Sequence, residues 1–289
     1  MERRTFLKLT AAAGATSLAG CASAPRSAED AGEDYAVLVD LTQCAGCRMC
    51  EFACAEANGL PEPDYDEKTV DQVRREPSER QWQVVNRFET SAGEVYARRQ
   101  CMHCLEPACA AGCLTKALVK TDEGPVVWRA DKCMGCRYCM ISCPFDGPKF
   151  EYHSPVPRIQ KCQMCWERLR AGERPACVED CPMEALVFGK RSELLELARQ
   201  RIYGNPGDYV PHIYGEHEAG GTSWLYLSPV PFAELGFPTN LGTTSYPELT
   251  RDFLTAVPVV LTVWPAFLLA LRRANVGDDE TAGSPAREE

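Results

Sequence analysis

Positive charge is scarce in this sequence. Its 289 residues contain 31 Lys and Arg against 41 Asp and Glu, which gives a formal net charge of −10 at pH 7. Because no basic patch is available to neutralise phosphates, the composition excludes a nucleic-acid-binding protein. The acidic residues form short, scattered runs, which we interpret as solvated surface.

Recognisable catalytic chemistry is also missing. The Gly-Gly pair at 220–221 resembles a phosphate-binding loop only weakly, because the lysine of a P-loop is absent. No acid–base pair is set apart, and no molybdopterin or nickel site is evident. The sequence therefore predicts a chain that is not itself an enzyme and that takes part in catalysis only within a complex.

Cysteine, by contrast, is abundant and regularly spaced. Of the 17 cysteines, only Cys21 stands outside four quartets. The first and third quartets have the C-x2-C-x2-C-x3-C spacing that bacterial ferredoxins use to hold cubane iron–sulfur clusters. Four quartets are what four [4Fe–4S] clusters require at four thiolates each. In chain order the quartets are Cys44, Cys47, Cys50, Cys54; Cys101, Cys104, Cys109, Cys113; Cys133, Cys136, Cys139, Cys143; and Cys162, Cys165, Cys177, Cys181.

The quartets also repeat among themselves. The first and third share a Gly-Cys-Arg step, at 46–48 and 135–137, and the second and fourth share a Pro-Ala-Cys step, at 107–109 and 175–177. We interpret the chain as a duplicated unit. Two other uses of cysteine fit less well. A structural zinc site needs two cysteine pairs separated by a long loop, and sulfurs this close along one strand cannot staple distant segments as disulfides.

Residues 1–33 predict export. Arg3-Arg4-Thr5-Phe6-Leu7-Lys8 resembles a twin-arginine signal, and the apolar stretch after it is too short and too weakly apolar to span a bilayer. That route carries folded proteins, which suits clusters inserted in the cytoplasm; the alternative is an ordinary cytoplasmic helix. Leu18-Ala19-Gly20-Cys21 resembles a lipoprotein processing box, so Cys21 is either lipidated or a chance match. Residues 22–33 are expected to form a flexible tether.

Residues 34–203 are predicted to form an α+β domain of two ferredoxin-like modules. Ser192 is expected to be the N-cap of a helix that runs to about Arg201. Strands are expected at 35–40, 81–89, 94–99, 117–121, 126–128 and 185–188, with a polar surface loop at 60–80.

Several polar side chains stand beside the cysteines. His103 lies inside a quartet that is already complete, so we expect it to pack around the ligands rather than to bind metal. Arg48, Lys132, Arg137 and Lys161 either raise cluster potentials by offsetting negative charge or are surface residues, and the sequence leaves both possibilities open.

The chain after residue 203 contains no cysteine. Residues 204–251 are rich in Gly, Pro, Tyr and Thr. One strand is expected at 224–227, after a Gly-rich turn. We interpret this segment as a structural or subunit-contact extension.

Residues 252–273 predict a single transmembrane helix. Their uncharged, mostly apolar run is long enough to cross a bilayer, and Pro258 and Pro265 are tolerated in such helices. A buried helix of a soluble protein is the alternative. Arg272-Arg273 would be cytoplasmic by the positive-inside rule, which places the cluster domain outside, and 274–289 would form a disordered tail.

With four quartets, an export signal and one C-terminal span, the whole chain resembles the four-cluster iron–sulfur subunits of membrane-bound respiratory oxidoreductases. Residues 214–238 are most similar to the subunit of periplasmic uptake hydrogenases of the hydrogenase-2 type. The resemblance implies an electron relay between a catalytic NiFe hydrogenase subunit and a quinone-reactive integral-membrane subunit, at the inner membrane and facing the periplasm. A molybdopterin partner, as in formate dehydrogenases or dimethyl sulfoxide and polysulfide reductases, is one alternative. A free-standing lipoprotein electron carrier is another, and Cys21 departs from the family pattern.

The same resemblance implies how the quartets share clusters: the first with the fourth, and the second with the third. The implied ligand sets are Cys44, Cys47, Cys50 and Cys181 for cluster 1; Cys54, Cys162, Cys165 and Cys177 for cluster 2; Cys101, Cys104, Cys109 and Cys143 for cluster 3; and Cys113, Cys133, Cys136 and Cys139 for cluster 4.

Overall fold

The computed structural model describes residues 34–282, with side chains described as far as Arg273. The predicted twin-arginine signal, Cys21 and the predicted tether lie outside the described residues, as do 283–289. The described chain mixes short strands with short helices, so the coarse α+β expectation is confirmed.

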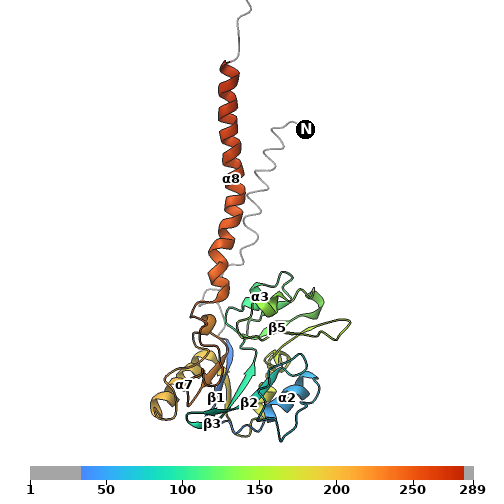
Figure 1. Ribbon diagram of the computed structural model, residues 1–289, viewed down its shortest axis with the longest axis vertical. Helices are drawn as coiled ribbons and strands as arrows, with labels where there is room; N and C mark the ends of the chain where they lie inside the picture. The colour runs from blue at the N-terminus through green and yellow to red at the C-terminus, as the bar shows by residue number, and fades with distance from the viewer. Residues whose placement is uncertain (1–33, 283–289) are drawn as a thin grey trace, which may run out of the picture. The chain divides into compact units, whose positions relative to one another are not determined.

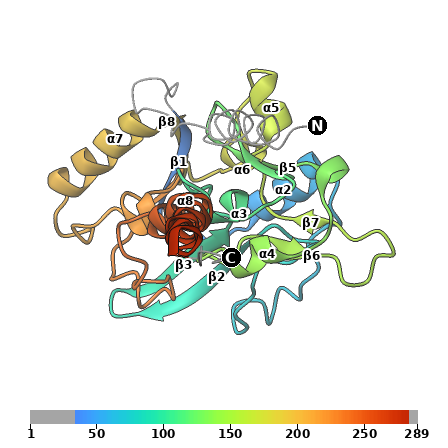
Figure 2. The same cartoon turned by 90° about the horizontal axis from the view of Figure 1, so that it is seen from above.

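A three-stranded sheet organises the core. Its central strand β1 (Tyr35–Asp40) pairs antiparallel with β8 (Leu186–Lys190) and parallel with β9 (Trp224–Leu227). Figure 2 shows β8 beside β1. Because β1 has a neighbour on both edges and its apolar run is buried on both faces, it lacks the alternation of polar and apolar residues seen in half-exposed strands. The segment after residue 203 thus supplies a strand to the sheet that begins the described chain.

The two faces of this sheet contribute to different cores. Val37 and Val39 of β1 point into the larger core, which also contains Tyr226, Phe232 and Phe237. The alternate residues, with Leu38 and Leu225 among them, pack against the helix α7 (Arg191–Gly204). The alternation follows from the two-residue period of a strand. Several cysteine side chains pack at the edge of the larger core, so the cysteine-rich loops are built onto this sheet.

Helix α7 corrects one expectation. It begins at Arg191 directly after β8, and Lys190 occupies the N-cap position, so Ser192 lies in the first turn and is not the cap. The reason is tertiary: the Arg191 amide binds Asp34 O at 3.0 Å and its guanidinium binds Glu216 O at 2.9 Å. These contacts fix the chain as helix one residue before Ser192.

Three hairpins stand apart from the central sheet. The first is β2 (Gln83–Thr90) with β3 (Gly93–Gln100), and the second is β4 (Leu118–Lys120) with β5 (Val126–Trp128). Both were expected, as were β1, β8 and β9. The third, β6 (Lys149–Phe150) with β7 (Ile159–Gln160), was not expected because two residues are too few to show a strand period.

Short helices carry many of the cysteines. Helix α2 (Met49–Asn58) contains Cys50 and Cys54, and three four-residue helices contain one cysteine each. Those three are α3 (Ala108–Ala111), α4 (Tyr138–Ile141) and α6 (Ala176–Glu179). The remaining short elements are α5 (Trp166–Arg170), η1 (Ala130–Lys132) and η2 (Glu218–Gly220).

The long C-terminal helix α8 (Tyr246–Ala282) is drawn in red in Figure 1. The most apolar 18-residue window of its part from Tyr246 to Arg273 has a mean hydropathy of 2.1, and none of that window is buried. By length and composition it is a candidate for a membrane span, and Pro258 and Pro265 lie inside it. The helix continues to Ala282, into the segment 274–289 that was expected to be a disordered tail, and that expectation stays a prediction.

Candidate metal centres

The first Cys-x-x-Cys pair of each quartet turns on a left-handed residue. The second spacer residues Gly46, His103, Gly135 and Met164 have φ angles of 69°, 49°, 73° and 52°. Such turns direct successive backbone N–H groups towards one side, which creates a concavity that attracts negative charge. The four loops are thus built alike in backbone as well as in cysteine spacing, and two of them use glycine where a side chain would be strained.

Backbone N–H groups reach the cysteine sulfurs. The amide of Met164 donates to Cys162 Sγ at 3.3 Å, and the amide of Ala117 donates to Cys113 Sγ at 3.2 Å. A third bond of 3.3 Å runs from Gly147 to Cys143 Sγ. Hydrogen bonds to sulfur stabilise the thiolate form and are one of the means by which proteins set cluster potentials.

Two cavities are each lined by four thiols that come from two quartets. The first lies beside β1 and α2, with apolar walls and the guanidinium of Arg98. The second lies between the β4–β5 hairpin and α4. The first cavity is lined by Cys44, Cys47, Cys50 and Cys181, and the second by Cys113, Cys133, Cys136 and Cys139. We call these sets group 1 and group 4.

The other eight thiols also gather in two sets. The thiol of Cys54 lies among those of Cys162, Cys177 and Cys165, close enough for mutual charge repulsion. The thiol of Cys104 lies in the same way among Cys143, Cys101 and Cys109. We call the set around Cys54 group 2 and the set around Cys104 group 3. The sets are grouped here as in the ligand sets that the resemblance implied, and which four thiols share one cluster stays a prediction.

The four groups form a line in the sense that the thiols of each group are close enough to act electrostatically on those of the next. Cys177 of group 2 acts on Cys50 of group 1, and Cys101 of group 3 acts on Cys162 of group 2. Cys139 of group 4 acts in turn on Cys109 of group 3. An exposed cysteine occurs only in the end groups, Cys47 in group 1 and Cys136 in group 4, among residues 34–282.

Burial makes most of these thiols reluctant to ionise. Burial, more than the neighbouring thiols, raises the pKa of Cys50 to about 12 and that of Cys143 to about 11. The pKa of Cys54 is raised well above its usual value for the same reason. Cys113 differs: burial raises its pKa, but hydrogen bonds from Leu118, Thr115 and Ala117 outweigh this and lower it.

These groups fit an iron–sulfur core. A metal ligand must be a thiolate, and crowded, buried thiolates are stable only around a positively charged centre. When bound, a [4Fe–4S] cluster supplies one-electron transfer.

His103 and Lys161 lie inside the protein rather than on its surface. The amide of Val126 donates to His103 Nδ1 at 2.9 Å, and burial, reinforced by Lys161 and Lys120, lowers the pKa of His103 well below its usual value. The imidazole is therefore held neutral. The ammonium of Lys161 donates to the carbonyls of Val126 and Cys162.

The remaining cations beside the cysteines divide into two kinds. Arg48 is buried and forms an ion pair with Asp71, whereas Lys132 and Arg137 are exposed. The sequence had left open whether these residues raise cluster potentials or belong to the surface. Lys132 and Arg137 are exposed, and an effect of Arg48 or Lys161 on cluster potentials stays a prediction.

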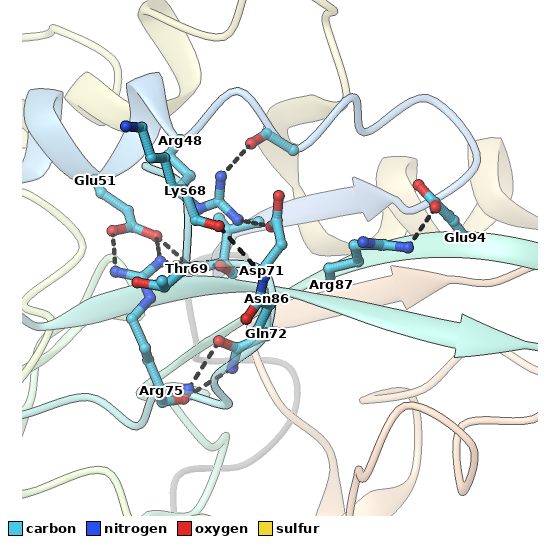
Figure 3. Close-up of polar contacts among 12 residues, drawn as sticks. Arg48, Glu51, Lys68, Thr69, Asp71, Gln72, Arg75, Asn86, Arg87 and Glu94 are labelled. Carbon is cyan, nitrogen blue, oxygen red and sulfur yellow. Dashed lines mark hydrogen bonds and ion pairs between the residues drawn. The ribbon is translucent and has the colours of Figure 1, made fainter. Parts of the chain in front are cut away.

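A buried ion pair holds the surface loop against the first quartet. Figure 3 shows the carboxylate of Glu51 facing the guanidinium of Arg75, with N–O distances of 2.9 and 2.6 Å. Glu51 also accepts a bond of 2.6 Å from the amide of Val85 on β2. Because Arg75 belongs to the irregular stretch between α2 and β2, the pair ties that stretch to the helix that carries Cys50 and Cys54.

Arg98 was missed by sequence reasoning. It lies on β3, is 3% exposed, and its guanidinium stacks 4.5 Å from the ring centre of Trp224. Its charge acts on thiols of both group 1 and group 2. Because the nearest cysteine along the chain belongs to a different group, no local motif could have revealed this placement.

Comparison with known proteins is consistent with this geometry. Residues 93–191 match a family model described as a 4Fe-4S dicluster domain. The chain belongs to the family of ferredoxin-type iron–sulfur electron-transfer subunits.

Two relatives match nearly the whole chain, and a third matches 70% of it. It is 32% identical over 328 residues to the hydrogenase-2 operon protein HybA of Escherichia coli O157:H7, covering 98% of both chains. It is 46% identical over 297 residues to a protein of Nitratidesulfovibrio vulgaris, covering 98% of this chain and 80% of that one. The iron-sulfur subunit of the nitrate-inducible formate dehydrogenase of Escherichia coli K12 is 32% identical over 210 residues, covering 70% of this chain and 71% of that subunit.

Proposed function

We propose that the chain relays electrons through four [4Fe–4S] clusters, bound by groups 1 to 4, between a periplasmic catalytic subunit and a quinone-reactive membrane subunit. The observation that carries the proposal is the linear order of the four thiol groups, in which the thiols of each group act electrostatically on those of the next. A relay needs such an order, whereas four separate structural metal sites do not.

The chain's own residues have three tasks in this relay. The thiolates hold the clusters, and amides such as those of Met164 and Gly147 donate hydrogen bonds to sulfur. The buried residues of groups 2 and 3 keep water from the middle of the line. Cys47 and Cys136, exposed at opposite ends of the line, mark where electrons enter and leave.

A NiFe hydrogenase is the catalytic partner that we favour. The likeness to the hydrogenase-2 operon protein covers 98% of both chains and so includes the extension after residue 203 and α8. A molybdopterin enzyme is the second candidate, because formate dehydrogenase iron-sulfur subunits match at the same identity, although over 70% of the chain. A free-standing lipoprotein carrier depends on Cys21, which lies outside the described residues.

Membrane attachment through α8 completes the proposal. The Arg272-Arg273 pair at the end of its apolar part favours a cytoplasmic C-terminus and a periplasmic cluster domain. Ser245, directly before α8, donates a 2.6 Å hydrogen bond to Glu106, which lies between Cys104 and Cys109. This contact supports a membrane partner near groups 3 and 4, so group 1 would face the catalytic subunit.

Metal analysis of the complex tests this proposal. The chain would be tagged and the complex isolated without oxygen from gently solubilised membranes. We expect about sixteen irons per chain together with nickel. Molybdenum or tungsten in place of nickel would keep the relay and replace the hydrogenase by a molybdopterin enzyme. A chain that purifies without partners would identify a free-standing carrier, and zinc without iron would refute the relay altogether.

A further inference from the structure

Arg98 is a buried cation without a carboxylate partner. Its Nε donates to Gln100 Oε1 at 3.1 Å, while its Nη1 is buried and has no hydrogen-bond partner. Within residues 34–282 no Asp or Glu forms an ion pair with it. Two other guanidinium groups near the first quartet differ from it, because Arg75 binds Glu51 through both terminal nitrogens and Arg48 forms an ion pair with Asp71.

Such a group needs compensating negative charge. Burying an unpaired ion is among the most expensive changes that a folded protein can make. Arg98 lines the cavity of group 1 together with Cys44, Cys47, Cys50 and Cys181. Among the groups that interact with its charge are Tyr226 and the group 2 thiols of Cys177, Cys162 and Cys54. These cysteines belong to groups 1 and 2 and to no other group.

We propose that Arg98 is a fixed positive charge placed between the first two clusters, where it raises the reduction potentials of both. The inference rests on the proposed function, because it requires clusters at groups 1 and 2. Arg98 binds no iron and touches no substrate; it is a positioning residue that acts on the clusters through space. A cluster held by four thiolates is negatively charged, so it also supplies the counter-charge that Arg98 lacks.

The direction of the effect follows from electrostatics. Reduction adds one electron to a cluster and forms or breaks no bond to the protein, so only the charge of the site changes. A neighbouring cation stabilises the reduced state more than the oxidised state. Low-dielectric surroundings strengthen this interaction, and Arg98 is buried beneath the aromatic side chain of Trp224. A guanidinium stays charged at any physiological pH, so the effect is permanent.

The charge of Arg98 affects the two clusters at one end of the line. Groups 1 and 2 share a buried cation, whereas the nearest arginine to group 4, Arg137, is exposed. Electrons would therefore rest more readily on the first two clusters than on the last. The end that faces the catalytic subunit would therefore hold two clusters with higher reduction potentials than the last cluster.

The test compares variants in the intact complex. Midpoint potentials would be measured by EPR-monitored redox titration for the wild type, Arg98→Met, Arg98→Lys and Arg99→Met. Arg99 is the matched control, since it is the next residue on β3 but forms an ion pair with Glu76 at 2.8 Å. We expect Arg98→Met to lower two of the four potentials by at least about 59 mV, a tenfold change in a one-electron equilibrium constant. The midpoint potentials of Arg98→Lys and Arg99→Met should differ from those of the wild type by less than half of that shift.

Each of the other possible results either supports or contradicts the proposed role of Arg98. Arg98→Met with full iron content and unchanged potentials would overturn the proposal, as would an equal shift in Arg98→Lys, which retains the charge. If Arg98→Met loses iron, the iron content of Arg98→Lys decides: retention supports a charge effect, and loss in both variants indicates a role in packing. Failure of the relay itself is seen separately, as a wild-type complex without iron.

Discussion

The first and third quartets have the same cysteine spacing and yet occupy different surroundings. In the first, Cys54 is followed by Ala55, and α2 continues to Asn58. In the third, Cys143 is followed by Pro144, and α4 ends at Ile141. Proline cannot continue a helix because it lacks the N–H and clashes with the preceding turn. Spacing therefore determines which thiols meet, while the residues between and after them determine how deeply the site is enclosed.

The residues that surround the two quartets also leave the first quartet more enclosed than the third. The first quartet is enclosed by the surface loop, by Tyr96 and by the Glu51–Arg75 pair. The third quartet is bordered by large apolar side chains that are more than half exposed, namely Met134, Tyr138 and Ile141. An enclosed site suits a fixed internal position, and an apolar rim suits contact with another subunit or with lipid.

Removing a ligand from each site tests this difference most strongly. Cys54 is buried in group 2, so Cys54→Ser should lose about four irons and also loosen the packing of α2 on α6. Cys136 is exposed in group 4, so Cys136→Ser should lose a similar amount of iron but leave the rest of the fold intact. Iron content and resistance to limited proteolysis measure the two effects. Equal proteolysis of both variants would contradict the comparison.

The buried carboxylate of the first quartet offers the next largest effect. Glu51 stands directly after Cys50, where the third quartet has Met140 after Cys139. Glu51→Met leaves the guanidinium of Arg75 buried and unpaired, which we expect to cost about 3–5 kcal/mol. The temperature at which half of the cluster absorbance is bleached ranks the stability of the variants against that of the wild type.

A double variant separates charge from packing at the same position. Adding Arg75→Met to Glu51→Met removes both charges and should recover much of the loss. Met140→Leu is the control and should cost less than about 1.5 kcal/mol. A double variant no more stable than Glu51→Met alone would show that the unpaired charge is not the cause.

The glycines of the two loops provide a smaller, matched contrast. Gly46 and Gly135 have nearly equal φ angles of 69° and 73°. A Cβ at Gly46 would lie 2.3 Å from the ring of Tyr96, whereas a Cβ at Gly135 would meet nothing nearer than Phe150 at 4.0 Å. We expect Gly46→Ala to cost about 2–4 kcal/mol and Gly135→Ala about 1–2 kcal/mol, the latter from the left-handed backbone alone. Similar thermal midpoints for the two variants would mean that Tyr96 moves aside.

Much of the candidate site could be predicted from sequence because its signals are local. Cysteine spacing, the hairpins around Gly93 and Gly124, and the apolar run of α8 each lie within a short stretch of chain. The parallel pairing of β1 with β9 could not be predicted, since it joins segments far apart in the chain. Arg98 was missed for the same reason, and Ser192 was misassigned because Arg191 is fixed by distant carbonyls.

Two arginines that follow the same Gly-Cys step give the smallest expected difference. Arg48 is buried and forms an ion pair with Asp71, whereas Arg137 is exposed and lies 5.3 Å from the ring centre of Phe150. Arg48→Met leaves Asp71 unpaired at the edge of the surface loop, so we expect a loss of about 1–2 kcal/mol. Arg137→Met should change stability by about 0.5 kcal/mol or less. Thermal midpoints at low and high salt measure both, and the Arg48→Met effect should shrink little with salt because the pair is partly buried. An equal effect at both arginines would remove the distinction drawn between the two quartets.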